Sequence, residues 1–472
     1  MRKTKIICTL GPASENEEMI EQLFRSGMNV ARLNFSHGTH ENHKKTIELL
    51  RKVRDRLELP AAVLLDTKGP EIRTRLLEGD KAELKEGQTF TLISDDKLGN
   101  SEFVSITYPS LNKMVSAGNI IKIDDGSIVL EVTEIIGTDV VCKVLVGGTL
   151  KNRKSINVPG VHLDVPYLSE ADKADVLFAV ENDVDYIAAS FVRTRQDVTD
   201  LRKFLNYHGG HNIKIISKIE NSEGVANFSE ILEESDGIMV ARGDMGVEVE
   251  YEKLPGLQKR FIKTCYGSGK IVITATQMLE SMIHSYNPTR AEITDVANAV
   301  FDGTSAVMLS GETAMGDHPA RVVEVMSKIV RQAASDAISM NMFADRSFVR
   351  EMDTANAICD AACTTAKDLN AQAIIAVTKS GHSARRLSKF RPTEPIVAST
   401  PEVKTYHQLS LSWGVHPVLA LCQENEEKLF LHALDCAKQI DVVKRGDTVV
   451  IVGGAPINVS GNTNMIKVLK AD

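Results

Sequence analysis

Eight short apolar runs between Lys5 and Ser310 constrain the fold more than any other feature of the chain. Several alternate with amphipathic helical patterns, and repeated strand–helix units imply a parallel sheet. Eight such units in one core favour a closed (β/α)8 TIM barrel over an open doubly wound sheet, because near-continuous apolar strands are typical of that architecture. The runs are KIICTL, VARLNF, AVLLDT, YIAASF, KIISKI, GIMVA, IVITA and SAVMLS.

The first helical pattern predicts its own boundaries. Ser14 is expected as the N-cap, and Glu17 three residues later completes a capping box. Gly27 is expected to end the helix, because glycine adopts the left-handed conformation common after the last turn.

Two segments differ from the barrel units in their pattern of apolar residues. Residues 70–166 carry alternating apolar runs such as SIVLEV between turn signals, which predicts a small β-barrel domain. This insert leaves the barrel after the C-terminal end of a strand, where barrel active sites form, so we expect it to act as a lid. Residues 341–472 return to alternating strands and helices, which predicts a third, α/β domain. The barrel is then expected to comprise residues 1–69 and 167–340.

Composition and charge exclude several classes of partner. The 472 residues are 43% hydrophobic and 25% charged, enough to build several domains with cores of their own. A net charge of −8 leaves no basic surface for nucleic acid or an anionic membrane, and no run reaches the length of a spanning helix. No secretory leader precedes the first strand, so a cytoplasmic location is expected. The seven cysteines lack a Cys-x-x-Cys pair, and we expect all of them in hydrophobic cores.

Charged side chains follow the fifth and sixth predicted strands at their C-terminal ends. Lys218 and Glu220 are two residues apart and share one face, and Asp244 follows the next strand. Two carboxylates suit a hard divalent ion such as Mg²⁺, and the backbone at Gly243 offers N–H groups to an anion. The alternative for Lys218 and Glu220 is an ordinary ion pair at an exposed strand end.

The second and third strands also end in polar residues. Arg32 offers a guanidinium fork for phosphate or carboxylate. Asn34, Ser36, Asp66 and Thr67 offer one carboxylate among neutral oxygens, which suits a monovalent cation better than a divalent one. For Asp66, an N-cap or turn role is equally open at this point.

Two other patterns imitate functional motifs. His37, His40 and His43 lie close together but lack the zinc-binding His-Glu-x-x-His pattern, so we expect them to be solvated. The stretch 267–270 (GSGK) resembles a fragment of a phosphate loop. It lacks the earlier glycine and the following serine or threonine, so it is predicted to be a helix-to-strand turn.

The longer strings around these residues resemble the pyruvate kinase family along essentially the whole chain. They are MNVARLNFSHG, LLDTKGPEIRT, IKIISKIENSEG, MVARGDMGVE, ITATQMLESM, PTRAE and DGTSAVMLSGETA, in the family's order. The resemblance implies phosphoryl transfer from phosphoenolpyruvate to ADP, giving pyruvate and ATP in the last step of glycolysis. It also implies Mg²⁺ (or Mn²⁺) and K⁺ as cofactors, allosteric regulation and a homotetramer.

The resemblance further implies roles for the residues at the strand ends. Glu220 and Asp244 match the Mg²⁺ ligands, and Lys218 matches the cation that stabilises the phosphoryl group during transfer. Arg32 matches the phosphate clamp. The backbone of Gly243 and Asp244, with the Thr276 side chain, matches the site for the substrate carboxylate. The proton donor to the enolate stays open between Thr276 and a relayed water.

Other residues match the family's cation and nucleotide sites. The residues that match the K⁺ site are Asn34, Ser36, Asp66 and Thr67. Glu71 stands where K⁺-dependent members carry glutamate, which predicts dependence on a monovalent cation. The residues that match positions near the nucleotide phosphates are Arg73, His37 and, from the lid, Lys154.

The third domain contains a string, TKSGHS, that resembles the family's effector phosphate loop. It comprises Thr378, Lys379, Ser380, Gly381, His382 and Ser383. Its hydroxyls and helix-opening N–H groups suit a sugar phosphate, and a plain strand-to-helix turn is the alternative. Residues 453–464 lack the Trp-Arg stretch of relatives regulated by fructose 1,6-bisphosphate. The effector therefore stays open between a sugar phosphate, a nucleotide such as AMP, and none.

Two rival functions have less support from the residues. A barrel lyase or mutase acting on phosphoenolpyruvate needs no second phosphate acceptor, so Lys218 and the lid residue Lys154 argue against it. A catalytically inactive paralogue is disfavoured because Arg32, Lys218, Glu220, Asp244 and Thr276 are all present.

Overall fold

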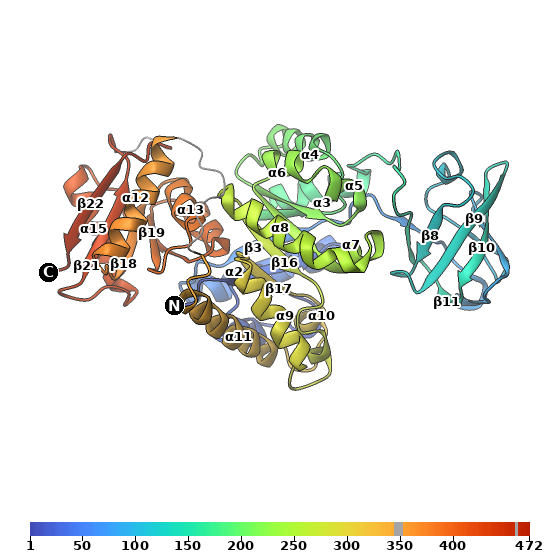
Figure 1. The fold of residues 1–472 in the computed structure, drawn as a ribbon, viewed down its shortest axis with the longest axis horizontal. Coiled ribbons are helices and arrows are strands. Elements are labelled where there is room, and N and C mark those ends of the chain that lie inside the picture. The colour runs from blue at the N-terminus through green and yellow to red at the C-terminus, as the bar shows by residue number, and fades with distance from the viewer. Residues whose placement is uncertain (344–352, 458–460) are drawn as a thin grey trace.

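The structure is a computed structural model that describes residues 1–343, 353–457 and 461–472. Eight parallel strands close into a barrel in the order β1-β17-β16-β15-β14-β13-β3-β2, which confirms the predicted architecture. Figure 1 shows β3, β16 and β17 in the middle part of the molecule, with helices around them. Each of the eight apolar runs contains one of these strands. Their bounds are β1 (Lys5–Thr9), β2 (Val30–Asn34), β3 (Ala62–Asp66), β13 (Tyr186–Ala189), β14 (Lys214–Ile219), β15 (Gly237–Ala241), β16 (Ile271–Ala275) and β17 (Ala306–Leu309).

Helices cover the outside of the barrel and connect its strands. They are α1 (Glu17–Ser26), α2 (His40–Arg56), α3 (Glu170–Glu181), α4 (Arg195–Tyr207), α5 (Ser222–Ala226), α6 (Phe228–Glu234), α7 (Arg242–Glu248), α8 (Leu254–Gly267), α9 (Arg290–Phe301), α10 (Gly311–Ala314) and α11 (Pro319–Ser339). The chain turns from α8 into β16 at 268–270, as the GSGK stretch predicts. Short 3-10 helices are η1 (Glu78–Asp80), η2 (Leu111–Lys113), η3 (Tyr251–Lys253), η4 (Glu280–Ile283) and η5 (Leu409–Leu411).

The predicted N-cap of the first helix is wrong. The Asn16 side chain accepts a hydrogen bond from Met19 N at 2.9 Å, so Asn16 is the N-cap. Ser14 lies one turn earlier, where its own N–H donates to Gly11 O at 2.7 Å and its hydroxyl accepts from Gly11 N. That turn uses the Ser14 hydroxyl before the helix begins. The predicted end is right, since Gly27 adopts φ 128° and donates to Leu23 O.

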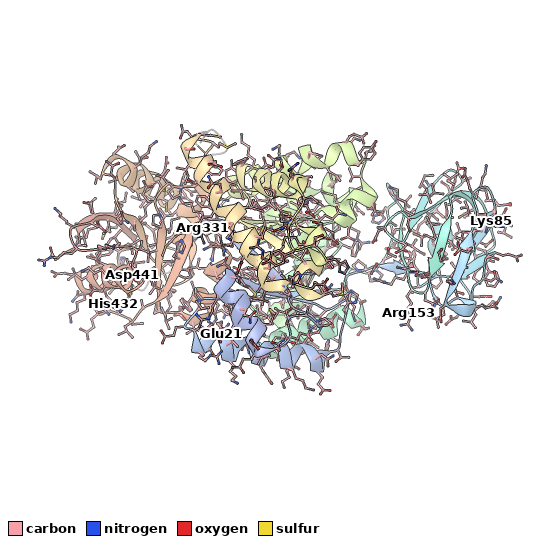
Figure 2. All side chains as sticks on the ribbon, turned by 90° about the horizontal axis from the view of Figure 1, so that it is seen from below. Glu21, Lys85, Arg153, Arg331, His432 and Asp441 are labelled. Atoms are coloured by element: carbon pink, nitrogen blue, oxygen red, sulfur yellow. The ribbon has the colours of Figure 1, made fainter. Side chains whose placement is uncertain are left out.

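The insert forms a seven-stranded sheet in the order β4-β12-β8-β9-β10-β6-β7, with a two-stranded sheet of β11 and β5 beside it. Hydrogen bonds from Thr107 N to Arg73 O and from Arg75 N to Ser105 O join the β4 and β7 edges, so the sheet curls into a small barrel as predicted. Figure 2 shows this body, with Lys85 and Arg153 labelled, at one end of the molecule. Its strands are β4 (Ile72–Arg73), β5 (Lys81–Leu84), β6 (Thr89–Ile93), β7 (Phe103–Ser105), β8 (Ile120–Ile123), β9 (Ile128–Ile136), β10 (Asp139–Val146), β11 (Gly148–Lys151) and β12 (Ser155–Asn157).

The C-terminal part is a five-stranded sheet in the order β20-β19-β18-β21-β22 with helices packed against it (Figure 1). Its elements are α12 (Thr354–Asp368), β18 (Ala373–Val377), α13 (His382–Lys389), β19 (Ile396–Thr400), α14 (Val403–Gln408), β20 (Val415–Leu419), α15 (Glu426–Gln439), β21 (Thr448–Gly453) and β22 (Met465–Lys470). The two edge strands were not predicted from the sequence, because β20 contains Pro417 and most of β22 is only partly buried.

The apolar core is layered in the way expected of a barrel. One cluster of buried side chains lies between the strands and the helices, and a second fills the barrel interior. The interior cluster includes Leu411 of the C-terminal part, and the Tyr186 hydroxyl donates to Gln408 O at 2.6 Å. The C-terminal part therefore closes the base of the barrel and leaves the opposite end for chemistry.

The expectation for the cysteines is right for six of the seven. These six are buried, whereas Cys422 is exposed in the loop after β20. Within the described ranges, no helix combines the length and apolarity needed to cross a membrane.

Candidate active site

A layer of polar side chains lies directly above the apolar interior of the barrel. Each member stands two residues after a side chain of the interior cluster, so it points to the same side of its strand. We call this set the polar layer. Its members, with the preceding interior residues in parentheses, are Thr9 (Ile7), Arg32 (Val30), Asp66 (Leu64), Ser190 (Ala188) and Lys218 (Ile216).

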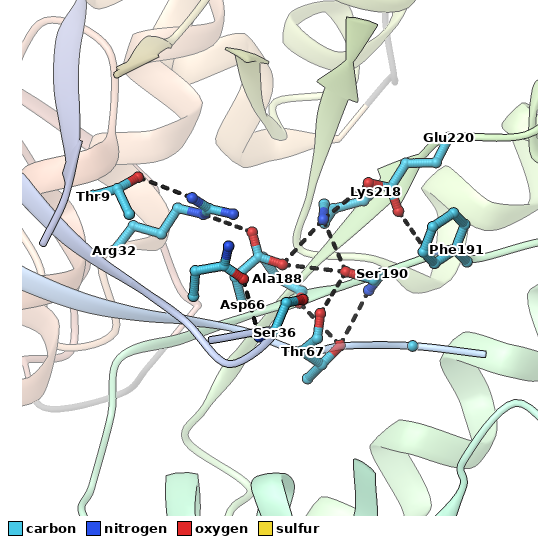
Figure 3. A network of polar contacts seen from close by, with 12 residues as sticks. Thr9, Arg32, Ser36, Asp66, Thr67, Ala188, Ser190, Phe191, Lys218 and Glu220 are labelled. Atoms are coloured by element: carbon cyan, nitrogen blue, oxygen red, sulfur yellow. Dashed lines mark hydrogen bonds and ion pairs between the residues drawn. The ribbon is translucent and has the colours of Figure 1, made fainter. Parts of the chain in front are cut away.

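Lys218 lies between Asp66, Ser190 and Glu220 (Figure 3). Its Nζ lies 2.9 Å from Glu220 Oε1 and 3.1 Å from Asp66 Oδ1, and it donates to Ser190 Oγ at 2.8 Å. Only 9% of the residue is exposed, so an ion pair at an exposed strand end does not describe it. Burial disfavours the charged form, but the two carboxylates outweigh burial and raise the pKa of Lys218. The lysine is therefore a fixed positive charge.

Asp66 binds two cations of the polar layer side by side. Its Oδ2 accepts from Arg32 Nε at 2.7 Å, and its Oδ1 faces Lys218. Burial would raise the pKa of Asp66, but the charges of Arg32 and Lys218 outweigh it and lower the pKa. Arg32 also donates to Thr9 Oγ1 at 2.9 Å, which fixes its guanidinium. A simple turn or N-cap role does not account for these contacts of Asp66.

Glu220 and Asp244 place two negative charges close to Lys218. Glu220 is 1% exposed, and its Oε2 accepts from Phe191 N at 2.7 Å. Burial raises the pKa of Glu220 to about 8 against the charge of Lys218, and the Asp244 carboxylate adds to the rise. Asp244 stands in the first turn of α7. A buried carboxylate destabilised by a second one fits a divalent cation, which would relieve both charges.

The described residues contain no group of three or more His, Cys, Asp and Glu side chains arranged to hold a metal. An ion of the Mg²⁺ type takes one or two protein carboxylates and completes its shell with water and substrate oxygens.

The four residues matched to the K⁺ site come together at the ends of β2 and β3. Asn34 lies opposite Asp66 in the strand register, and Ser36 N donates to Asn34 Oδ1 at 3.2 Å. Thr67 N donates to Ala188 O at 3.1 Å, and Figure 3 shows Ser36 and Thr67 beside Asp66, which lies between Arg32 and Lys218. The four residues are thus neighbours, and the Asp66 carboxylate among them also pairs with Arg32 and Lys218.

Thr276 directly follows β16 and meets the start of α7. Its Oγ1 accepts from Gly243 N at 2.8 Å, so the threonine hydroxyl and the first N–H groups of α7 lie together. Asp244, the next residue along α7, belongs to the same turn. The three residues matched to the substrate carboxylate site are therefore neighbours.

The residues matched to the nucleotide site lie on two parts of the molecule. Arg73 and Lys154 belong to the insert, where Arg73 pairs with Glu71 at 2.7 Å and Lys154 pairs with Asp124 at 2.8 Å. Thr74 N donates to Lys154 O at 2.8 Å and Lys154 N donates to Thr74 Oγ1 at 2.9 Å, which holds the two segments together. His37 lies on the exposed turn after β2.

The expectation that all three clustered histidines are solvated is wrong for His43. It is 6% exposed, stacks on Phe35 with ring centroids 4.2 Å apart, and contacts His37 O through Nε2 at 2.8 Å. His43 is on the buried face of α2, where helical periodicity outweighs its polarity. It supports the turn that carries Ser36 and His37.

The insert docks on the barrel across a cleft that holds part of the site. The cleft lining includes Glu71, Asp244 and Glu248. Asn157 Nδ2 donates to Glu248 Oε1 at 3.0 Å. Arg193 of the barrel donates to Leu163 O at 2.6 Å, on the segment that returns from the insert. The insert therefore faces the rim at which the polar layer ends.

The predicted effector loop runs from the end of β18 into the first two residues of α13 and lines a pocket of the C-terminal part. Gly381 adopts φ 81° and donates from its N–H to Thr378 Oγ1 at 3.0 Å. Lys379 lies 3.6 Å from Glu402, which lines the same pocket. Of the stretch 453–464, residues 458–460 lie outside the described residues.

Two members of the polar layer, Ser190 and Thr9, were not predicted as site residues. Ser190 and Thr9 were assigned to the apolar strand runs, although each is the polar residue at a strand's C-terminal end. Ser190 Oγ donates to Thr67 O at 2.7 Å and lies 3.2 Å from Asp66 Oδ1. Counting two positions from each interior residue would have found both.

The chain forms a closed parallel barrel, and fixed cations and carboxylates lie at its C-terminal rim, opposite an inserted domain. These features define a (β/α)8-barrel enzyme with a charged active site. Comparisons with known proteins identify the family. The family model described as pyruvate kinase, barrel domain, matches residues 1–323, and the pyruvate kinase alpha/beta domain model matches residues 356–469. The chain belongs to the pyruvate kinase family.

Individual relatives agree with the family models. The chain is 47% identical to the pyruvate kinase of Clostridium acetobutylicum over 469 residues, covering 99% of both proteins. It is 48% identical to the pyruvate kinase of Staphylococcus haemolyticus, covering 99% of this chain and 80% of that protein. The crystal structure of a pyruvate kinase from Cryptosporidium parvum superposes with a TM-score of 0.94 at 43% identity, covering 100% of this chain and 96% of that one.

Proposed function

We propose that the chain transfers the phosphoryl group of phosphoenolpyruvate to ADP, giving pyruvate and ATP, with Mg²⁺ and K⁺ as cofactors. The observation that carries the proposal is the buried Lys218, held 2.9 Å from Glu220 and 3.1 Å from Asp66 at the barrel rim. Enzymes of phosphoryl transfer act mainly by positioning and electrostatic stabilisation, and a fixed ammonium beside carboxylates supplies both.

Lys218 and Arg32 supply positive charge where the phosphoryl group moves. Asp66 and Ser190 hold the ammonium of Lys218, and Asp66 and Thr9 hold the guanidinium of Arg32. Because both cations are oriented before the substrate binds, little reorganisation accompanies the reaction. Arg32 binds the phosphate through its fork, and Lys218 stabilises the charge that spreads over the transferring oxygens.

Glu220 and Asp244 are the residues that would hold Mg²⁺. When bound, this ion polarises the phosphoryl oxygens and neutralises part of their charge. Glu220 must lose its proton to act as a ligand, and the neighbouring Lys218 ammonium favours the ionised carboxylate. Phe191 N holds the second oxygen of Glu220 and fixes its direction.

The substrate carboxylate binds at the start of α7. We assign the backbone of Gly243 and Asp244 and the Thr276 hydroxyl to this anion. Gly243 N donates to Thr276 Oγ1 at 2.8 Å and that hydroxyl donates to Ala275 O at 2.6 Å, so the substrate carboxylate would replace these two bonds. The enolate left after transfer takes a proton on carbon, from the Thr276 hydroxyl or from a water next to it. A threonine hydroxyl is a weak acid, so both donors are compatible with the geometry.

Cations and nucleotide are assigned to the remaining matched residues. K⁺ is assigned to four residues at or just after the ends of β2 and β3, which are Asn34, Ser36, Asp66 and Thr67. The proposed dependence on K⁺ also rests on Glu71, which lines the same cleft as Asp244. The ADP phosphates are bound by Arg73, Lys154 and His37, and the insert acts as the lid.

Regulation and assembly complete the proposal. A sugar phosphate or a nucleotide binds the loop Thr378–Ser383, whose hydroxyls and N–H groups line the pocket of the C-terminal part. We also propose a cytoplasmic homotetramer with domains at 1–69 with 167–340, 70–166 and 341–472.

The proposal is tested by a coupled assay of pyruvate formation from phosphoenolpyruvate and ADP. We expect turnover that requires Mg²⁺, rises when K⁺ replaces a bulky organic cation, and responds to AMP or to a sugar phosphate. Absence of pyruvate formation with Mg²⁺, K⁺ and both substrates would refute the catalytic part. Activity that does not respond to K⁺ would refute only the monovalent-cation assignment.

A further inference from the structure

Two consecutive residues with side chains adopt left-handed backbone conformations at the rim of the site. Thr276 has φ 68° and Gln277 has φ 53°, directly after β16. L residues other than glycine rarely adopt this region, and a β-branched threonine does so only when its surroundings hold it there. The conformation brings the Thr276 hydroxyl against Gly243 N–H. Some part of the structure must therefore hold this backbone.

The Arg242 guanidinium contacts the carbonyls of this turn. It donates to Thr276 O at 2.6 Å and to Gln277 O at 3.2 Å, and Ala275 O lies 3.4 Å away. A planar guanidinium can serve several successive acceptors at once, which a single ammonium cannot do with the same geometry. The next residue, Gly243, donates to the Thr276 side chain. One short segment thus holds both the backbone and the hydroxyl of Thr276.

Arg242 is itself fixed by helices outside the barrel. It forms an ion pair with Asp295 of α9 at 2.7 Å and lies 3.4 Å from Gln258 Oε1 of α8. Its side chain is 13% exposed. The Arg242 guanidinium donates to Asp295, to Gln258 and to the carbonyls of the turn. It therefore connects the turn to the outer helices α8 and α9.

We propose that Arg242, oriented by Asp295, is a positioning residue that keeps Thr276 in its left-handed conformation and so places the hydroxyl for the reaction. The step from the held turn to catalysis rests on the proposed function, in which Thr276 touches the substrate. The holding of the turn itself rests only on the contacts of Arg242.

The first test replaces the guanidinium. Arg242→Met and Arg242→Lys should each lower kcat by about 10- to 100-fold, the range expected when a reacting group is displaced by about 1 Å. The KM for phosphoenolpyruvate should change by less than about threefold, because the substrate's main charged contacts remain. Arg202→Met is the matched control, since Arg202 also pairs with an aspartate and donates to Ile213 O, but at the opposite end of the barrel. It should lower stability and leave kcat near the wild-type value.

The second test is a second substitution that restores kcat to the Arg242→Met variant. Such a rescue is not expected if Arg242 only stabilises the fold in general. Gln277 is exposed, and glycine adopts positive φ without steric cost. Gln277→Gly in the Arg242→Met background should therefore recover at least about a tenth of the wild-type kcat. In a Thr276→Ala background, Arg242→Met should have little further effect, because both changes remove the same placed hydroxyl.

Crystal structures of the Arg242→Met variant supply a readout that does not depend on activity. We expect Thr276 to leave positive φ and its Oγ1 to move away from Gly243 N. A kcat within threefold of the wild type, or an unchanged Thr276 conformation, would overturn the proposal. Loss of kcat without rescue by Gln277→Gly would overturn it as well. A wild-type chain that forms no pyruvate would refute the proposed function, and the conformation of Thr276 in the variant would still decide whether Arg242 holds the turn.

Discussion

Replacing Lys218 by methionine removes the central charge of the polar layer while keeping an unbranched side chain of similar length. In the structure its ammonium lies within about 3 Å of three oxygen partners, and the proposed transferring oxygens meet the same charge. A unit charge about 3 Å away in a medium of effective dielectric about 20 contributes about 5 kcal/mol. We therefore expect kcat to fall by roughly 10³- to 10⁴-fold.

Affinity for phosphoenolpyruvate should survive the change, because Arg32 and the start of α7 still bind its charged groups. Asp66 keeps its ion pair with Arg32, and Glu220 keeps the bond from Phe191 N, so the barrel should still fold. The measurement is kcat and KM in the coupled assay, with calorimetric binding of phosphoenolpyruvate in the presence of Mg²⁺.

Lys214→Met is the matched control for this prediction. Lys214 starts the same strand and pairs with Asp236 at 3.2 Å at the other end of the barrel, so its loss should leave kcat unchanged. The reasoning is refuted if Lys218→Met keeps kcat within tenfold of the wild type. It is also refuted if the whole loss is a loss of substrate binding, since the stabilisation is assigned to the transition state.

Three further predictions concern other parts of the molecule. Ser190→Ala removes a hydrogen bond to Lys218, and we expect kcat to fall by roughly 3- to 10-fold, with a change of melting temperature too small to explain it; an unchanged kcat would contradict this role. Burial, with nearby positive charge, lowers the pKa of His407 to about 4 and of His416 to about 2, below an unfolded value of about 6.5. Their stabilisation is present above pH 6.5 and is lost as the pH falls towards the folded values, by about 1.4 kcal/mol per histidine and pH unit. Urea unfolding between pH 7 and 5 should show this slope, and His416→Phe should reduce it; an equal slope in the variant would contradict the assignment. Asn157→Ala removes a lid contact with the barrel, so the KM for ADP should rise by roughly 2- to 10-fold while kcat changes less, and an unchanged KM would show that this contact does not hold the lid.

Local rules predicted the strands of the barrel well and the edges of elements less well. The eight apolar runs were sufficient because each buried strand needs apolar residues on both faces. The two edge strands of the C-terminal sheet carry a weaker signal, since an edge strand is partly solvated and tolerates Pro417. Ser14 satisfied the capping pattern, yet a turn with Gly11 had already used its hydroxyl.

The residues of the candidate site could be predicted where a charged side chain stands at the end of a predicted strand. Lys218, Glu220, Asp66 and Arg32 were found because each is a charged residue at the end of an apolar run. Ser190 was not, because a single hydroxyl at the end of such a run does not stand out by composition.

The order and alternation of apolar and polar residues determined that this chain forms a barrel, an inserted β domain and an α/β domain, with charged groups at one end of the barrel. Only the tertiary structure decided how those groups act on one another. Asp66 orients two cations, Glu220 has a raised pKa beside Lys218, and Arg242 holds the left-handed turn at Thr276. These effects depend on distances of a few ångströms and on burial between segments far apart in the chain, and local sequence patterns do not encode either quantity.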